Sequence, residues 1–174
     1  MNTSLQLLPS IGVDADSNLA QLVHFYKKNT PFATLEGWEW DALSWDAKGI
    51  CKTQASKAGY NISVNFNRDN NLGKKVKSSR DDMKPFHNLD LSDIAKCHIS
   101  ALQIEKSKDV GTLNFYILAY RHLDNVMLKR NITASTLTTY DFKVAEAEAH
   151  DKIEDSTFYR VGQRLESIAK FINQ

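Results

Sequence analysis

Apolar residues recur at helical spacing along the last third of the chain. In the segment 156–172, successive apolar residues follow one another at steps of three, four, three and four: Phe158, Val161, Leu165, Ile168 and Ile172. This spacing places them on one face of a helix. Segment 113–130 is equally amphipathic, the alanine-rich segment 141–152 lies between the two, and residues 90–106 show the same period. The pattern predicts four helices after residue 86.

Residues at the ends of these segments are typical of helix termini. Asp90 is suited to cap the first helix, Gly111 separates it from the second, and Asn131 follows the second as a candidate C-cap. Thr138 precedes Asp141 by three residues, which resembles a capping box at the start of the third helix. The bundle is therefore expected to have short connections.

The pattern before residue 86 is mixed. Residues 17–29 have helical period and predict one helix. Residues 59–67 alternate strictly between apolar and polar side chains and predict a strand, for which residues 38–43 are the nearest candidate partner. Residues 70–79 form a polar, basic loop that predicts a linker ending near Pro85.

We therefore predict a mainly α protein in two domains. Residues 1–85 would form a small α+β region with the helix, a Trp-rich segment, the strand and the basic loop, and residues 86–174 would form a four-helix bundle.

All three tryptophans of the chain, Trp38, Trp40 and Trp45, fall within eight residues. The first interpretation is a local aromatic core that docks helix 17–29. The alternative is a platform on which nucleic-acid bases stack, which would require exposed rings.

Composition narrows the classes of function. The chain has 174 residues, 42% of them hydrophobic, and a formal net charge of +1, so any affinity for nucleic acid must come from the placement of charges. Cys51 and Cys97 are too few for a disulfide framework and predict buried thiols in a reducing compartment. No apolar run approaches the length of about 20 residues that a membrane span needs. These features indicate a cytoplasmic protein with no membrane contact.

The residues offer little for catalysis. Five histidines are scattered without paired ligand spacing, neither cysteine lies in a CxxC motif, and no glycine-rich phosphate loop is present. The acidic residues lie mostly at predicted caps or on solvated helix faces. We expect no metal, no cofactor and no catalytic residues in this chain.

Basic residues suggest a binding surface. On helix 156–172, the side chains away from the apolar stripe suit a helix that enters the major groove of DNA, where Arg and Gln read base edges and Thr and Tyr hold phosphates: Thr157, Tyr159, Arg160, Gln163 and Arg164. Further phosphate contacts are expected from Lys129 and Arg130, and from Lys74, Lys75 and Lys77 in the basic loop. The alternatives are that Arg160 and Arg164 pair with Glu154 or Glu166, and that the loop is simply solvated.

Three stretches of the bundle resemble the core-binding domain of tyrosine recombinases, the phage-integrase family. They are GTLNFYILAYRHLDNVMLKRN, TLTTYDFKVAEAEAHDK and STFYRVGQRLESIAKFINQ, at residues 111–131, 136–152 and 156–174. Upstream, Trp45-Asp46, NISVNF and LSDIAKCHI are similar to N-terminal regions of longer integrases of bacterial mobile elements. The resemblance implies binding of double-stranded DNA during integration and recombination, in the bacterial cytoplasm at the nucleoid.

The family's chemistry uses a tyrosine nucleophile in a separate catalytic domain, and neither Tyr140 nor Tyr159 matches its motif. The resemblance therefore implies that the chain is a DNA-binding N-terminal fragment without catalytic activity, monomeric by itself and part of a tetramer on DNA in the parent enzyme. The alternative is a helical protein-interaction or regulatory domain, which the near-neutral net charge favours.

Overall fold

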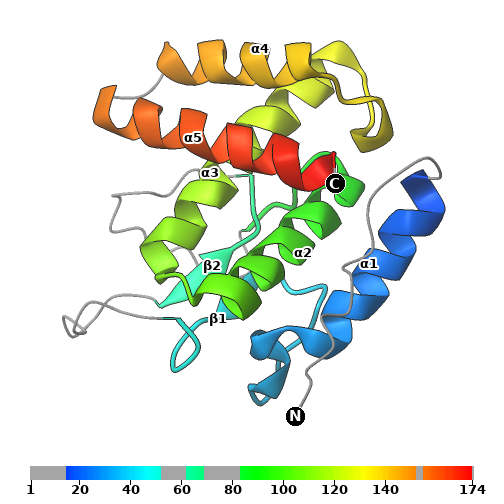
Figure 1. Cartoon of the computed structure of the whole chain (residues 1–174), viewed down its shortest axis with the longest axis vertical. Helices are drawn as coiled ribbons and strands as arrows, with labels where there is room; N and C mark the ends of the chain where they lie inside the picture. The colour runs from blue at the N-terminus through cyan, green and yellow to red at the C-terminus, as the bar shows by residue number, and fades with distance from the viewer. Residues whose placement is uncertain (1–14, 52–61, 69–82, 152–154, 174) are drawn as a thin grey trace.

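The computed structural model describes residues 15–51, 62–68, 83–151 and 155–173. These residues are mainly helical, with one small antiparallel sheet (Figure 1), as predicted. The α-helices are α1 (Ala15–Asn29), α2 (Leu89–Lys106), α3 (Val110–Arg130), α4 (Thr139–His150) and α5 (Asp155–Ile172), the short 3-10 helices are η1 (Pro31–Thr34) and η3 (Ala134–Thr136), and the strands are β1 (Ser44–Asp46) and β2 (Ser63–Asn65). Four α-helices follow residue 86, which confirms the predicted bundle.

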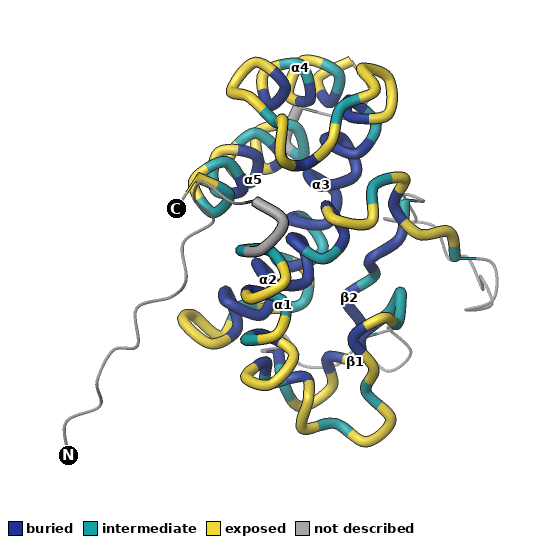
Figure 2. The backbone as a smooth tube through the Cα atoms, turned by 90° about the vertical axis from the view of Figure 1, so that its right-hand side faces the viewer, coloured by how far each residue is buried: buried dark blue, intermediate teal, exposed yellow. Residues whose placement is uncertain are grey.

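The bundle is built around α3. Helices α4 and α5 run antiparallel beside each other, and both contact α3. Helix α2 packs between α3 and α1, while β2 contacts α3. Figure 2 shows the consequence for burial: α2 and α3 are largely buried, whereas α4 and α5 each keep an exposed side. Helix α5 is therefore an outer helix.

The helix ends differ in part from the predicted ones. The N-cap of α2 is Asn88, whose side chain accepts a hydrogen bond of 2.9 Å from the Leu91 backbone, so the prediction of Asp90 as the cap is wrong. Asp90 lies in the first turn, where its negative charge interacts favourably with the positive end of the helix dipole. Gly111 does not separate α2 from α3, because α3 begins at Val110 after the cap Asp109.

Two predicted helix ends are confirmed. Asn131 ends α3 in the left-handed conformation, with φ of 53°. Thr138 and Asp141 form the predicted capping box at the start of α4.

The sheet pairs β2 with a segment just after the predicted partner. Ser44, Trp45 and Asp46 lie opposite Asn65, Val64 and Ser63. Residues 38–43 were therefore the wrong partner, although a hydrogen bond of 2.7 Å from the Phe66 amide to the Leu43 carbonyl extends the ladder by one residue. Residues 38–42 contain no strand, with Trp40 and Asp41 in a turn, and in this conformation Trp40 is buried.

The tryptophans form the predicted aromatic core. Trp40 is 5% exposed and Trp45 is 1% exposed. The ring centroid of Trp45 lies 4.6 Å from that of Phe66 and 5.5 Å from that of Trp38. The Lys27 ammonium of α1 lies 5.8 Å from the Trp40 ring centroid. Because the Trp40 and Trp45 rings are buried, the alternative of a base-stacking platform is wrong for these two residues.

One hydrophobic core joins the parts before and after residue 86. It contains Tyr26 and Trp45 together with Leu91 and Ile117, all of them buried. The division of the chain into two domains at residue 86 stays a prediction.

Candidate nucleic-acid interface

Helix α5 carries the main predicted site, and its apolar stripe fixes how it lies. Val161, Leu165 and Ile168 are buried, as their spacing predicts. Gly162 faces α4 at such close range that an added Cβ would lie 2.8 Å from Oε1 of Glu146. The stripe is thus turned into the bundle, and the opposite side of α5 faces outward.

The outward side of α5 presents an aromatic, a cationic and an amide side chain within two helical turns. Tyr159 is 67% exposed, and Arg160 and Gln163 are also exposed. Thr157, predicted to lie with them, is only partly exposed. The structure therefore brings Tyr159, Arg160 and Gln163 together at the surface, and we call these three residues the α5 face.

Both arginines of α5 lie against aromatic rings of α3. The guanidinium carbon of Arg160 is 5.1 Å from the centroid of Phe115, and that of Arg164 is 4.9 Å from the centroid of Tyr116. Contacts of this geometry are attractive because the face of an aromatic ring carries negative charge density. Nothing in the linear sequence pairs these residues, so sequence reasoning missed Phe115 and Tyr116.

Arg164 is less accessible than predicted. It is only partly exposed, and its Nε is buried without a hydrogen-bond partner among the described residues. The reason is its place on the helix: Arg164 follows Val161 by three residues and precedes Ile168 by four, so it borders the buried stripe. The prediction that Arg164 points away from the apolar face is therefore wrong.

Glu166 does not pair with Arg160 or Arg164, so the alternative that this carboxylate neutralises them is wrong. Glu166 instead accepts a hydrogen bond of 2.6 Å from Lys170, one turn further along α5. This bond and the lysine charge lower the pKa of the Glu166 carboxyl. Glu154, the other predicted partner, lies outside the described residues.

The cations at the end of α3 are engaged with α4. The Lys129 ammonium lies 2.7 Å from Oε1 of Glu148. Arg130 pairs with Asp141 and lies over the Tyr140 ring, with 5.0 Å between the guanidinium carbon and the ring centroid. A phosphate would have to compete with both carboxylates.

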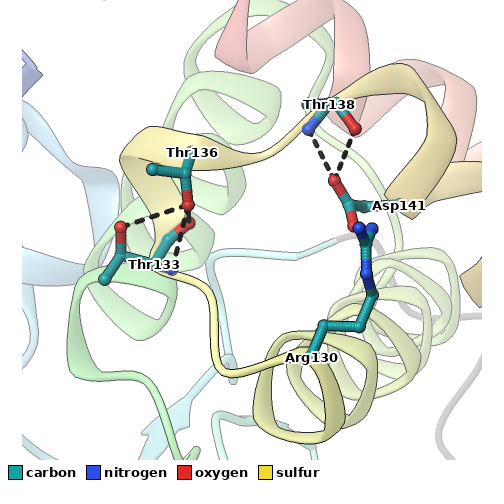
Figure 3. A network of polar contacts seen from close by, with 5 residues as sticks. All are labelled: Arg130, Thr133, Thr136, Thr138 and Asp141. Carbon is teal, nitrogen blue, oxygen red and sulfur yellow. Dashed lines mark hydrogen bonds and ion pairs between the residues drawn. The ribbon is translucent and has the colours of Figure 1, made fainter.

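Besides pairing with Arg130, Asp141 accepts hydrogen bonds at the start of α4. Its carboxylate also accepts hydrogen bonds from the backbone and the hydroxyl of Thr138, at 2.8 and 2.6 Å (Figure 3). The Asp141 side chain is only 1% exposed. The network therefore fixes the connection between α3 and α4, and Arg130 is part of that connection.

Distance also separates the α3 cations from the α5 face. Arg160 lies over Phe115 near the start of α3, whereas Lys129 lies fourteen residues later, about 20 Å along a helix that rises 1.5 Å per residue. The structure therefore does not gather all predicted contacts into one patch. The third predicted group, Lys74, Lys75 and Lys77, lies outside the described residues.

Burial favours the neutral form of three titratable side chains, Cys51, Cys97 and His98. Burial raises the pKa of the Cys51 thiol to about 11 and that of Cys97 still further, and both cysteines are free and buried. Burial, with a smaller effect of the Lys106 charge, lowers the pKa of His98 to about 3. Among the described residues, no cluster of His, Cys, Asp or Glu is arranged to hold a metal ion.

No protein family, characterised protein or solved structure was found to match the chain. In the described part of the chain, every helix is too short or too polar to cross a bilayer.

Proposed function

We propose that this chain binds double-stranded DNA through the outward side of α5. The observation that supports this most strongly is the α5 face itself: Tyr159, Arg160 and Gln163 are exposed on a helix whose opposite stripe is anchored in the bundle. An arginine and an amide can contact both phosphates and base edges, and a helix of this width fits the major groove. A rigid outer helix with these side chains is suited to docking on a duplex.

The resemblance to the core-binding domain of tyrosine recombinases extends the proposal. Under it, the bundle α2–α5 would clamp one side of a recombination site, and strand exchange would be the task of a catalytic domain. The described architecture, four helices with α5 on the outside, is compatible with such a clamp. The chain itself would contribute DNA contact and no chemical step.

Binding of a labelled mixed-sequence duplex across a salt series tests the proposal. Affinity should fall steeply as salt rises, because cations that contact phosphates release counterions from DNA. The variant Arg160→Ala should weaken binding. The matched control is Lys143→Ala, which removes one exposed cation of α4 from outside the α5 face and should change affinity only slightly. Absent or salt-independent binding at low ionic strength would refute the proposal.

A protein-interaction domain is the second candidate, and the ion pairs favour it. Lys129, Arg130 and Lys170 are each matched with a carboxylate. The chain has a net charge of only +1, so it carries almost no overall excess of cations. Tyr140 and Leu128, 62% and 54% exposed, add apolar surface near Arg130. If duplex binding is absent, this candidate becomes the better explanation.

A further inference from the structure

Arg160 differs from the other cations of the bundle that contact a ring: it is exposed and it contacts Phe115 without an ion pair among the described residues. The guanidinium carbon of Arg160 lies over the Phe115 ring, and among the described residues none of the Arg160 N–H groups donates a hydrogen bond to an oxygen or nitrogen. Arg160 is exposed, and among the described residues no carboxylate lies within ion-pairing distance of it. The N–H groups of Arg160 can therefore bind a ligand, while the contact with the Phe115 ring limits where the guanidinium lies.

Resting on the proposed DNA-binding function, we propose that Phe115 is a positioning residue that holds the Arg160 guanidinium for a bidentate contact with a phosphodiester group. The phosphodiester has two non-bridging oxygens that share one negative charge and are spaced to accept a pair of parallel N–H groups, which is the arrangement that arginine matches best. Preorganisation by the ring lowers the entropy that the long side chain loses when it binds.

The position of Arg160 favours phosphate over base edges. Base edges lie at the floor of a major groove about 8.5 Å deep, so a side chain must extend outward from its helix to reach them. The Arg160 side chain instead extends toward α3, with its guanidinium carbon 5.1 Å from the Phe115 centroid. On the α5 face it is thus Gln163 and the 67% exposed Tyr159 that remain available to reach into the groove.

The neighbouring pair shows why Arg160, and not Arg164, is assigned this role. Arg164 lies over Tyr116, whose ring is buried and whose hydroxyl is 3.4 Å from Oγ of Ser167. The Nε of Arg164 is itself buried. Arg164 therefore braces α5 against α3, while Arg160 keeps its edge at the surface.

The test compares five variants of the full chain in duplex binding across a salt series, on two unrelated mixed-sequence duplexes. They are Arg160→Ala, Arg160→Lys, Phe115→Leu, Phe115→Tyr and the double variant Phe115→Leu, Arg160→Ala. Arg160→Ala should weaken binding roughly tenfold and reduce the salt slope by about 0.9, equally on both duplexes. Arg160→Lys should bind more weakly than the wild type, because lysine keeps the charge but lacks the planar guanidinium that donates two parallel hydrogen bonds.

Phe115→Leu should weaken binding about threefold, the size of an exposed cation–π contact. Phe115→Tyr, which keeps the ring, should bind like the wild type. In the double variant, Phe115→Leu should add nothing to Arg160→Ala, because the ring acts only through the guanidinium. A thermal melt of each variant shows whether it is folded, and the exposed Arg160 variants remain informative if Phe115→Leu unfolds.

Three results would overturn the inference while leaving DNA binding intact. Wild-type affinity for Arg160→Lys would show that only charge matters. Additive losses for Phe115→Leu and Arg160→Ala would show that the ring does not act through Arg160. A loss of discrimination between the two duplexes, with an unchanged salt slope, would assign Arg160 to a base. Failure of the wild-type chain to bind either duplex would instead refute the proposed function itself.

Discussion

The indole Nε1 of Trp40 donates a hydrogen bond of 2.8 Å to Oδ1 of Asp93, and this bond joins the Trp-rich segment to α2. A second link lies nearby: the buried hydroxyl of Ser100 donates to that of Thr30 over 2.9 Å. The ammonium of Lys96, also buried, lies 6.0 Å from the Trp40 ring centroid. Helix α2 is thus covered by residues that precede position 86.

We therefore expect a fragment of residues 86–174 to fold poorly. Without the preceding residues, Lys96 and Ser100 of α2 would lose contacts that now bury them. The fragment should lack the cooperative thermal transition of the full chain in circular dichroism at 222 nm, and should bind a hydrophobic dye. A cooperative melt close to that of the full chain would show instead that the bundle is an independent domain.

Arg121 should be essential for stability. Its Nε donates to the Asn67 carbonyl over 2.5 Å, and its Nη2 donates to the Asn67 side chain over 2.6 Å. Arg121→Ala would leave these buried acceptors unsatisfied and should lower the free energy of unfolding by about 2–4 kcal/mol. Urea denaturation measures this. A loss below that of the exposed control Lys143→Ala, expected within about 0.5 kcal/mol, would contradict the role.

Arg130 should affect stability more than DNA binding. Arg130→Ala removes the ion-pair partner of buried Asp141, while Thr138 still donates two hydrogen bonds to it. We expect a loss of about 1–2 kcal/mol in the free energy of unfolding, because a buried carboxylate is left with fewer partners. Measurement of both stability and duplex affinity separates the roles. Wild-type stability with a large loss of affinity would restore Arg130 to the predicted phosphate contacts.

Most of the bundle could be predicted from the sequence because local patterns encode it. Periodic apolar residues located α3 and α5, and Thr138 with Asp141 located the start of α4. Asn88 was missed as a cap because both Asn88 and Asp90 are good capping residues, and only the backbone conformation distinguishes them.

The candidate site was harder to predict because its chemistry depends on contacts between helices. Sequence spacing placed Arg160 and Gln163 on one side of a helix. It could not show that Lys129 pairs with Glu148, nineteen residues away. Nor could it show which rings of α3 lie under the arginines of α5, since that depends on how the two helices cross.

His98 should make stability depend on pH. The ring is 4% exposed, stacks on Phe171 with 4.4 Å between centroids, and lies 3.0 Å from the Tyr120 hydroxyl. Burial lowers the pKa of His98 to about 3 in the folded protein, whereas a histidine in an unfolded chain has a pKa of about 6.5. Between these values the unfolded state holds more protons, so the free energy of unfolding falls as pH falls.

The effect of His98 can be isolated by comparison with His98→Gln, which does not titrate. Between pH 7 and pH 5, the wild type should lose about 2 kcal/mol more than the variant in the free energy of unfolding, measured by urea denaturation at each pH. The comparison cancels the carboxylates that titrate in both proteins. Parallel pH profiles would show that His98 keeps a normal pKa.

Gly162 offers a stabilising substitution beside the α5 face. Glycine within a helix costs up to about 1 kcal/mol relative to alanine, and Gly162 lies inside α5. The Cβ of an alanine would meet Oε1 of Glu146 at 2.8 Å. That oxygen ends a flexible, exposed side chain that can move away, so the clash is cheap to relieve.

Gly162→Ala should therefore raise the free energy of unfolding by about 0.5–1 kcal/mol, and the melting temperature with it. The double variant Gly162→Ala, Glu146→Ala removes the opposing oxygen and should gain at least as much as the single variant. Because Gly162 faces α4 and not the surface of Tyr159, Arg160 and Gln163, duplex affinity should stay at the wild-type value. If Gly162→Ala destabilises the chain and the double variant does not recover, then the backbones of α4 and α5, and not the Glu146 side chain, require glycine at this position.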